Sequence, residues 1–325
     1  MTLVSRRLIL VALAVAAALP SRALRAAEKP AEIRIDWATY NPVSLVLKDK
    51  RLLEQEFERD GIAIRWVQTL GSNKALEFLN AGSLDFGSTA GSAALVSRIN
   101  GNPIKAIYVY SRPEWTALVT RKDSAIATVA DLKGKRVAVT RGTDPHIFLV
   151  RALLAEKLTE KDITPVLLQH PDGKTALIRG DVDAWAGLDP MMAQAELEDG
   201  ARLFYRKPEA NTWGILNARE DFLKDHPDLI RRVLVVYEKA RRYSLANYDD
   251  LKKTFISATK LPEAVVDRQF KERTDITYSR IGAAQRDSIL AAGLALQQAS
   301  VIAANVDIHR AVDDLIDDRL PLSGN

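Results

Sequence analysis

The chain has 325 residues, no cysteine and a formal net charge of +4 at neutral pH. The lack of cysteine excludes disulfide bonds, thiolate metal sites and a cysteine nucleophile. Residues 1–27 contain four arginines and no acidic residue, so the rest of the chain carries 42 basic and 42 acidic residues. A chain without excess positive charge is a poor candidate for nucleic-acid binding, and we expect none.

The first 27 residues have the pattern of a secretory signal peptide. Arg6 and Arg7 precede an uncharged apolar run over residues 8–19, Pro20 ends the run, and small residues follow. The run is shorter than the ~20 apolar residues of a membrane-spanning helix, which disfavours the alternative of a retained anchor. We expect export, cleavage near residues 23–27 and, without a cysteine to lipidate, a soluble product. The pattern leaves open the export route, general or twin-arginine, and the bond that is cleaved.

Beyond residue 27, short apolar strands alternate with amphipathic helices. The first part of this alternation predicts five strands, at residues 33–37, 62–67, 84–88, 104–110 and 116–120. Helices are predicted between them at residues 42–59, 72–81 and 92–99. Ser72 is the expected N-cap of the second helix, and Gly82 is its expected C-cap.

A similar alternation starts again after residue 131. It predicts strands at residues 136–139, 163–168 and 184–186 and helices at residues 145–158 and 174–179. A strand at 213–217 then leads into a mainly helical region with long helices at 228–247 and 283–299.

This order of elements predicts an α/β protein of two lobes that close like a hinged clamshell. The roughly 300 residues that follow the signal peptide suit two domains of ordinary size. We expect the first lobe to contain residues 28–118 and 214–325, including a helical C-terminal tail. The second lobe is expected to contain residues 119–213.

Three turns that follow strands and open helices are candidate binding loops. They occupy residues 87–92, 141–146 and 187–190. Ligands of open α/β sheets gather at the carboxyl ends of strands, where helix N-termini present unpaired N–H groups and a positive dipole end. Such turns bind anions without an arginine. The alternative is that they are ordinary caps, with Thr143 or Asp144 as N-cap and Pro145 at the first helical position.

Other kinds of site have weaker signals. The four histidines lack the spacing of metal ligands, and no Walker, dinucleotide or Gly-x-Ser-x-Gly pattern is present. We therefore expect no metal ion, no cofactor and no catalytic residue. Trp115, Trp185 and Trp213 lie near strand ends, where a tryptophan can pack on the apolar part of a ligand or belong to the core.

Three segments resemble the periplasmic substrate-binding proteins of ABC transporters for aliphatic sulfonates, which are relatives of the taurine and nitrate binders. They are LNAGSLDFGST at residues 79–89, VADLKGKRVA at residues 129–138 and GDVDAWA at residues 180–186. The first two are shared across the wider superfamily. The resemblance runs over nearly the whole chain after the signal peptide, and it implies a type II clamshell that closes on its ligand.

The resemblance also implies which residues contact the ligand. From the first lobe these are Thr39, Tyr40, Asn41, Ser88, Thr89, Ala90 and Gly91. From the second lobe and its junction they are Gly142, Thr143, Asp144, His146, Asp189 and Trp213.

The chain departs from the family pattern at two positions. Sulfonate binders usually carry a small hydroxyl residue where this chain has Asp144, and a carboxylate that faced the ligand would repel an anion. Either Asp144 turns away as a helix cap, or the ligand also carries an amine, or the ligand is not a simple sulfonate. The family also tends to place an aromatic residue where this chain has Leu188.

The function that the resemblance implies is capture of a small organic anion, an aliphatic sulfonate first of all, for an ABC permease of the inner membrane. We expect a periplasmic, monomeric, non-enzymatic protein. The alternatives are another ligand of the superfamily (taurine, a sulfate ester, nitrate or a pyrimidine precursor) and a role in sensing rather than transport. An enzyme is also conceivable on this scaffold, but the aryl sulfinate desulfinases and pyrimidine synthases that resemble it require cysteines.

Overall fold

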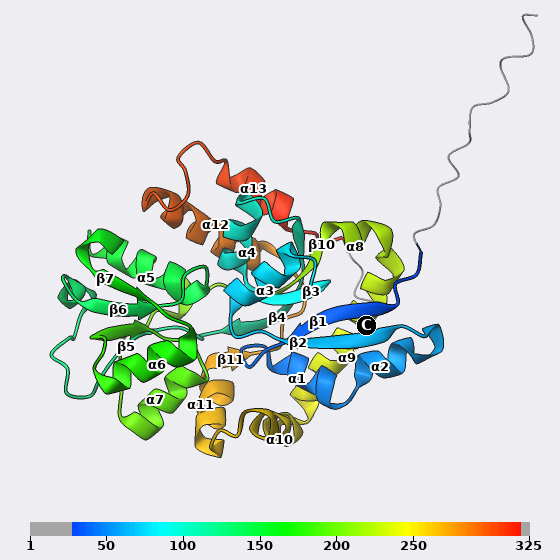
Figure 1. Cartoon of the computed structure of the whole chain (residues 1–325), viewed down its shortest axis with the longest axis horizontal. Coiled ribbons are helices and arrows are strands. Elements are labelled where there is room, and N and C mark those ends of the chain that lie inside the picture. The colour runs from blue at the N-terminus through cyan, green and yellow to red at the C-terminus, as the bar shows by residue number, and fades with distance from the viewer. Residues whose placement is uncertain (1–27, 320–325) are drawn as a thin grey trace, which may run out of the picture.

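The computed structural model describes residues 28–319, which fold into two α/β lobes lying side by side (Figure 1). The predicted signal peptide falls within residues 1–27 and lies outside the described residues. Each lobe has its own β-sheet covered by helices, as the alternation of strands and helices predicts. In residues 28–319, no helix combines the length and apolar character required to cross a membrane.

The first lobe is built on a six-stranded sheet with the order β11-β4-β10-β3-β1-β2. Its strands are β1 (Glu32–Trp37), β2 (Ala63–Gln68), β3 (Phe86–Ala90), β4 (Ile104–Pro113), β10 (Gly214–Arg219) and β11 (Thr274–Asp275). β1 runs parallel to β2 and β3, whereas β10 runs antiparallel to β3 and β4. The carboxyl ends of β1, β2 and β3 therefore lie at one edge of the sheet, as predicted for a ligand site of this architecture.

Helices cover both faces of this sheet. One group packs together below the sheet in Figure 1: α1 (Pro42–Asp49), α2 (Leu52–Phe57), α9 (Pro227–Ala246), α10 (Tyr248–Thr259) and α11 (Glu263–Arg273). The other group lies above it: α3 (Ser72–Asn80), α4 (Gly91–Ile99), α12 (Ala283–Gln298) and α13 (Ile308–Leu315). The short helix α8 (Glu220–Asp225) follows β10. Burial of apolar side chains between sheet and helices forms the larger hydrophobic core.

The second lobe is built on a five-stranded sheet with the order β7-β6-β8-β5-β9. Its strands are β5 (Leu118–Thr120), β6 (Arg136–Val139), β7 (Thr164–Leu167), β8 (Ala184–Ala186) and β9 (Arg202–Tyr205). Its main helices are α5 (Asp144–Ala155), α6 (His170–Arg179) and α7 (Met191–Asp199). Because β6, β7 and β8 are parallel, the turns that open α5, α6 and α7 lie at the same end of this sheet.

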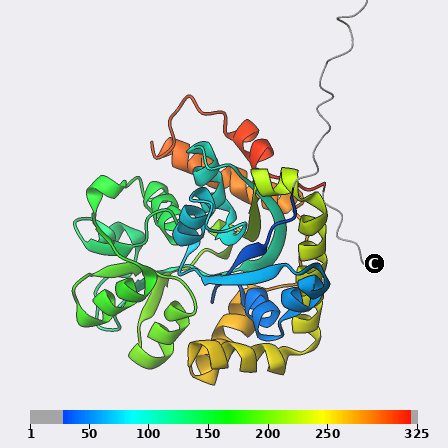
Figure 2. The same ribbon diagram turned by 45° about the vertical axis from the view of Figure 1, so that its right-hand side comes forward.

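The chain passes between the lobes twice, once from β4 to β5 and once from β9 to β10 (Figure 2). The lobes also touch through helices, since α7 packs on α11 and α5 packs on α4 and α12. The strand β5 of the second sheet begins at Leu118, one residue before the boundary we predict between the lobes. The division at residues 118 and 214 itself stays a prediction.

The structure corrects several predicted elements. The helix predicted at 42–59 is two helices, because Arg51 adopts a left-handed conformation (φ 51°) that ends the first. The helix predicted at 174–179 begins four residues earlier, at His170, and the strand β9 was not predicted. Most other predicted strands and helices are confirmed, with ends that differ by a few residues.

Candidate functional site

A small cavity lies between the two lobes. Its walls are Tyr40 and Ser72 from the first lobe, Trp115 from the β4–β5 connection, and Thr143, Asp144, Pro145, His170 and Leu188 from the second. All are buried. The free volume at its centre is about 10 Å³, close to the space that one water molecule needs. A ligand larger than water would therefore enter only if the lobes moved apart.

The N-termini of three helices meet at this cavity. Ser72 is the first residue of α3, Asp144 the first residue of α5 and His170 the first residue of α6. The first N–H groups of a helix have no acceptor within the helix, and they lie at the positive end of its dipole. The cavity therefore receives positive helix ends from both lobes, an arrangement suited to an anionic group.

Aromatic and apolar side chains form one wall of the cavity. The rings of Tyr40 and Trp115 meet edge to face at 6.1 Å. The Tyr40 hydroxyl donates to the Ser88 carbonyl (3.1 Å) and shares a hydrogen bond with Thr69 (2.9 Å), so this ring is fixed in place. Leu188 lies at the position where the family tends to carry an aromatic residue, and it too lines the cavity. This wall can contact the apolar part of an organic anion.

Asp144 is a wall of the cavity, and its carboxylate joins the two lobes through hydrogen bonds. The N-cap of α5 is Thr143, so Asp144 is not the cap of this helix. The two carboxylate oxygens accept hydrogen bonds from the hydroxyl of Ser92, from Trp115 Nε1 (2.8 Å) and from the amide (3.0 Å) and hydroxyl (2.7 Å) of Thr212. Ser92 belongs to the first lobe. Four donors partly compensate the negative charge, so repulsion of an anion in the cavity is weaker than for a bare carboxylate.

The turn at residues 87–92 does not offer free N–H groups, and this part of the prediction is wrong. The Ser88 amide donates to the Asp36 carboxylate (2.9 Å), the Ala90 amide to Ser72 Oγ (3.0 Å) and the Gly91 amide to the Trp213 carbonyl (3.0 Å). Buried N–H groups require an acceptor, and here the protein supplies each one itself. Burial raises the pKa of Asp36 to about 6, and the hydrogen bonds from Ser88 oppose this shift.

Three further predicted residues are not among the cavity walls, and each makes a hydrogen bond within the first lobe instead. The Asn41 amide donates to Ser88 Oγ (2.8 Å), and Thr89 Oγ1 accepts from the Asn217 amide (2.8 Å). The Thr39 carbonyl accepts from Gln269. Ser88 and Thr89 are neighbours on one strand, so their side chains point to opposite faces of the sheet and cannot serve one site together.

The structure also places four predicted residues of the second lobe and its junction away from the cavity walls. His146 Nε2 pairs with Glu160 (3.1 Å), and Asp189 forms a buried ion pair with Arg273 (3.2 Å). His146 Nε2 and the Asp189 carboxylate are thus already paired within the protein. The other two of these four residues are Gly142 and Trp213. The backbone of Gly142 is left-handed (φ 77°), and the Trp213 ring packs edge to face on Tyr278.

Of the predicted site residues, Tyr40, Thr143 and Asp144 line the cavity. The Thr143 hydroxyl donates to the Thr140 carbonyl (2.6 Å), so in this arrangement its proton is not directed at the cavity. The sequence did not single out Ser72 and His170 as ligand contacts. The signal available for both was their place a few residues after a strand, at the start of a helix.

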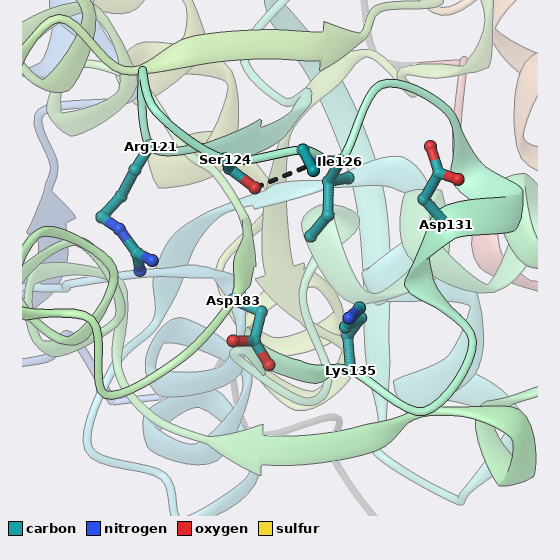
Figure 3. Close-up of a pocket in the computed structure, with 7 residues that line it drawn as sticks. Arg121, Ser124, Ile126, Asp131, Lys135 and Asp183 are labelled. Atoms are coloured by element: carbon teal, nitrogen blue, oxygen red, sulfur yellow. Dashed lines mark hydrogen bonds between the residues drawn. The ribbon is translucent and has the colours of Figure 1, made fainter.

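A wider hollow lies on the surface of the second lobe, with a free volume of about 240 Å³ (Figure 3). Its two carboxylates already have partners. Asp131 accepts from the amides of Ala127 and Thr128, and Asp183 pairs with Arg136. Because this hollow is built by one lobe alone, closure of the lobes would not enclose a ligand there. In the described part of the chain, no cluster of three or more potential metal ligands occurs.

The model of the NMT1/THI5-like family matches residues 57–250, more than half of the chain. The chain belongs to this family. A protein of Escherichia coli (strain K12) assigned as an aliphatic sulfonates-binding protein is 28% identical over 280 residues, 86% of this chain and 87% of that one.

Two solved structures of binding proteins are also similar. The alkanesulfonate-binding protein SsuA of Xanthomonas axonopodis pv. citri, bound to MOPS, superposes with a TM-score of 0.79 at 28% identity, covering 88% of this chain and 99% of that one. The periplasmic aliphatic sulphonate binding protein SsuA of Escherichia coli superposes with a TM-score of 0.74 at 26% identity, covering 91% and 95%. These similarities confirm the predicted two-lobe clamshell fold of periplasmic binding proteins.

Proposed function

We propose that this member of the NMT1/THI5-like family is the periplasmic substrate-binding component of an ABC importer, and that it captures a small organic anion of the aliphatic sulfonate class. The observation that carries the proposal is the cavity between the lobes, where helix N-termini of both lobes meet an aromatic wall. Similarity to sulfonate-binding proteins over nearly the whole described chain supports the same conclusion.

The two ends of a sulfonate match the two kinds of surface in the cavity. The anionic oxygens fit the positive ends of α3, α5 and α6, where backbone N–H groups can donate to them. The alkyl chain fits the wall of Tyr40, Trp115 and Leu188, where burial of each CH₂ contributes about 0.8 kcal/mol. We infer that Ser72 and Thr143 contact the head group.

The proposed function needs binding and lobe closure, and it needs no covalent step. The similar proteins described above are binding proteins, and this chain has no cysteine with which to support the chemistry of the enzymes that resemble it. Closure would bring together surfaces of both lobes, which a membrane permease can recognise as the loaded state. We propose that the exported protein acts as a monomer that delivers its ligand to such a permease.

A thermal-shift panel tests the proposed ligand class. Ethanesulfonate and longer alkanesulfonates should raise the melting temperature, because a ligand at 100 times its Kd stabilises the folded state by about 2.7 kcal/mol. Propylamine and propanol serve as cationic and neutral comparisons. A panel in which cationic or neutral compounds alone raised the melting temperature would contradict the sulfonate assignment.

Two variants locate the binding site in the same assay. Thr143→Trp should abolish the shift, because the larger ring fills the cavity between the lobes. Leu197→Trp changes an exposed leucine of α7 and should leave the shift unchanged. A full shift in a folded Thr143→Trp protein would place the ligand elsewhere.

A further inference from the structure

The His170 side chain has a buried nitrogen atom without a partner. The residue is fully buried and lines the cavity between the lobes, and its Nε2 makes no hydrogen bond in the structure. A buried polar atom without a partner is uncommon and requires an explanation. Since His170 is a cavity wall, the natural partner for Nε2 is a group of the ligand.

The hydrogen bonds around His170 Nδ1 determine whether Nε2 carries a proton. Thr140 Oγ1 lies 2.7 Å from the Leu168 carbonyl, and a carbonyl cannot donate, so the single hydroxyl proton of Thr140 points there. His170 Nδ1, 3.2 Å from the same oxygen, must then carry a proton and donate it. In the neutral imidazole this leaves Nε2 as an acceptor.

The surroundings keep the imidazole neutral. Burial lowers the pKa of His170 to about 3. The ring also sits on the first residue of α6, where the positive end of the helix dipole disfavours an imidazolium. At neutral pH the cavity thus presents a hydrogen-bond acceptor at this position and no additional positive charge.

A second acceptor lies close to the first. A Cβ atom built on Gly71 would stand 3.1 Å from His170 Nε2 and 2.9 Å from Asn73 Oδ1, so both atoms approach one point beside Gly71. Asn73 Oδ1 is buried and also has no hydrogen-bond partner. Gly71 and Asn73 belong to the first lobe and His170 to the second. The two acceptors therefore approach each other from opposite lobes. His170 lines the cavity together with Asp144, and Asn73 follows the wall residue Ser72 in the chain.

We propose that His170 is a specificity-determining ligand contact whose Nε2 accepts a hydrogen bond from a hydroxyl or ammonium group of the bound sulfonate. The protein would then select sulfonates that carry such a donor over plain alkanesulfonates. This inference rests on the proposed function and narrows its substrate class. A plain alkanesulfonate leaves Nε2 without a partner, whereas a donor group supplies the missing hydrogen bond.

Calorimetric titration with three ligands of similar size tests the selection. They are 2-hydroxyethanesulfonate, 2-aminoethanesulfonate and propane-1-sulfonate, in which a methyl group replaces the donor. We expect at least one donor ligand to bind about tenfold more tightly than propane-1-sulfonate. Comparison of 2-hydroxyethanesulfonate with 2-aminoethanesulfonate shows whether a hydroxyl or an ammonium donor is preferred.

A pair of variants assigns the preference to this side chain. His170→Leu should retain propane-1-sulfonate binding and lose the preference for a donor. His309→Leu alters an exposed histidine of α13 and should keep the preference. A His170→Leu protein that still prefers the donor ligand would overturn the inference.

Nitrogen NMR of histidine-labelled wild-type protein provides a test that does not depend on a variant folding. The Nε2 resonance of His170 should shift with the donor ligand, in the neutral tautomer, and should shift less with propane-1-sulfonate. An unchanged resonance, or protonation of both ring nitrogens on binding, would overturn the inference. Equal binding of all three sulfonates would also overturn it while leaving the proposed function intact, whereas absence of any sulfonate binding would refute the proposed function itself.

Discussion

Asp144 shows how one side chain can serve both the cavity and the contact between lobes. Its carboxylate accepts hydrogen bonds from Ser92 in the first lobe and from Trp115 and Thr212 in the connections between lobes. Hydrogen bonds to a charged group contribute about 1.5–3 kcal/mol, so these contacts favour the arrangement seen here. The negative charge that remains would favour a ligand that carries a positive or hydrogen-donating group in addition to its sulfonate.

Burial of His170 predicts a specific loss of stability in acid. In the unfolded chain the imidazole titrates near pH 6.5, whereas burial lowers its pKa to about 3 in the folded protein. Between these values the unfolded state binds one more proton than the folded state. The free energy of unfolding should therefore fall as the pH decreases below 6.5, by up to about 1.4 kcal/mol per pH unit from this residue.

Urea unfolding of wild type and His170→Leu between pH 7 and pH 4.5 measures this contribution. As the pH decreases, the free energy of unfolding of the wild type should fall relative to that of His170→Leu. His309→Leu removes an exposed histidine and should follow the wild-type profile. Parallel profiles for wild type and His170→Leu would show that His170 is not held neutral.

At this scale, three residues that the sequence singled out lie together in the structure, and their contact with a ligand stays a prediction. Tyr40, Thr143 and Asp144 were expected to contact the ligand and do line the cavity. The expectation of free N–H groups in the turn at residues 87–92 failed, because the acceptors of these groups, such as Asp36 and Ser72, come from distant parts of the chain. Such pairings depend on tertiary packing, which local patterns do not encode.

At the scale of elements, the predicted start of α6 determined whether His170 could be recognised as a ligand contact. The sequence analysis predicts a helix over residues 174–179, whereas α6 begins at His170 and has Pro171 in its first turn. Proline is in fact favoured in the first turn of a helix, where its missing N–H would have no partner. That preference was the signal that could have placed His170 at a helix N-terminus beside the ligand.

The loop between β2 and α3 brings Gly71 close to His170 of the other lobe. The φ of Gly71, 165°, is extended and causes no strain, but a Cβ would stand 2.9 Å from Asn73 Oδ1 and 3.1 Å from His170 Nε2. Gly71→Ala should therefore weaken sulfonate binding by keeping the lobes apart, with little change in the melting temperature of the ligand-free protein.

Gly282→Ala is the matched control for this change. A Cβ at Gly282 would make only an ordinary contact, 3.5 Å from Gln285, in an extended backbone. We expect calorimetric titration to show wild-type affinity for Gly282→Ala and lower affinity for Gly71→Ala. Equal affinities would show that Gly71 is not required for closure.

At the scale of the whole molecule, the sequence predicted the two-lobe α/β fold, because the alternation of strands and helices starts again after residue 131. It did not predict how the lobes meet. Arg273 of α11 pairs with Asp189 and Glu196 of the second lobe, and both Arg273 and Asp189 are almost fully buried. These residues lie 77 or more positions apart, and only the folded arrangement of the lobes brings them together.

The most direct test of the whole account is a crystal structure of the protein grown with 2-bromoethanesulfonate, whose bromine is located by anomalous scattering. The chain has no cysteine for this compound to alkylate. We predict that the sulfonate lies at the N-termini of α3, α5 and α6 and that the bromine lies against the wall of Tyr40, Trp115 and Leu188. Bromine density in the hollow lined by Arg121 and Lys135, with none between the lobes, would contradict the account.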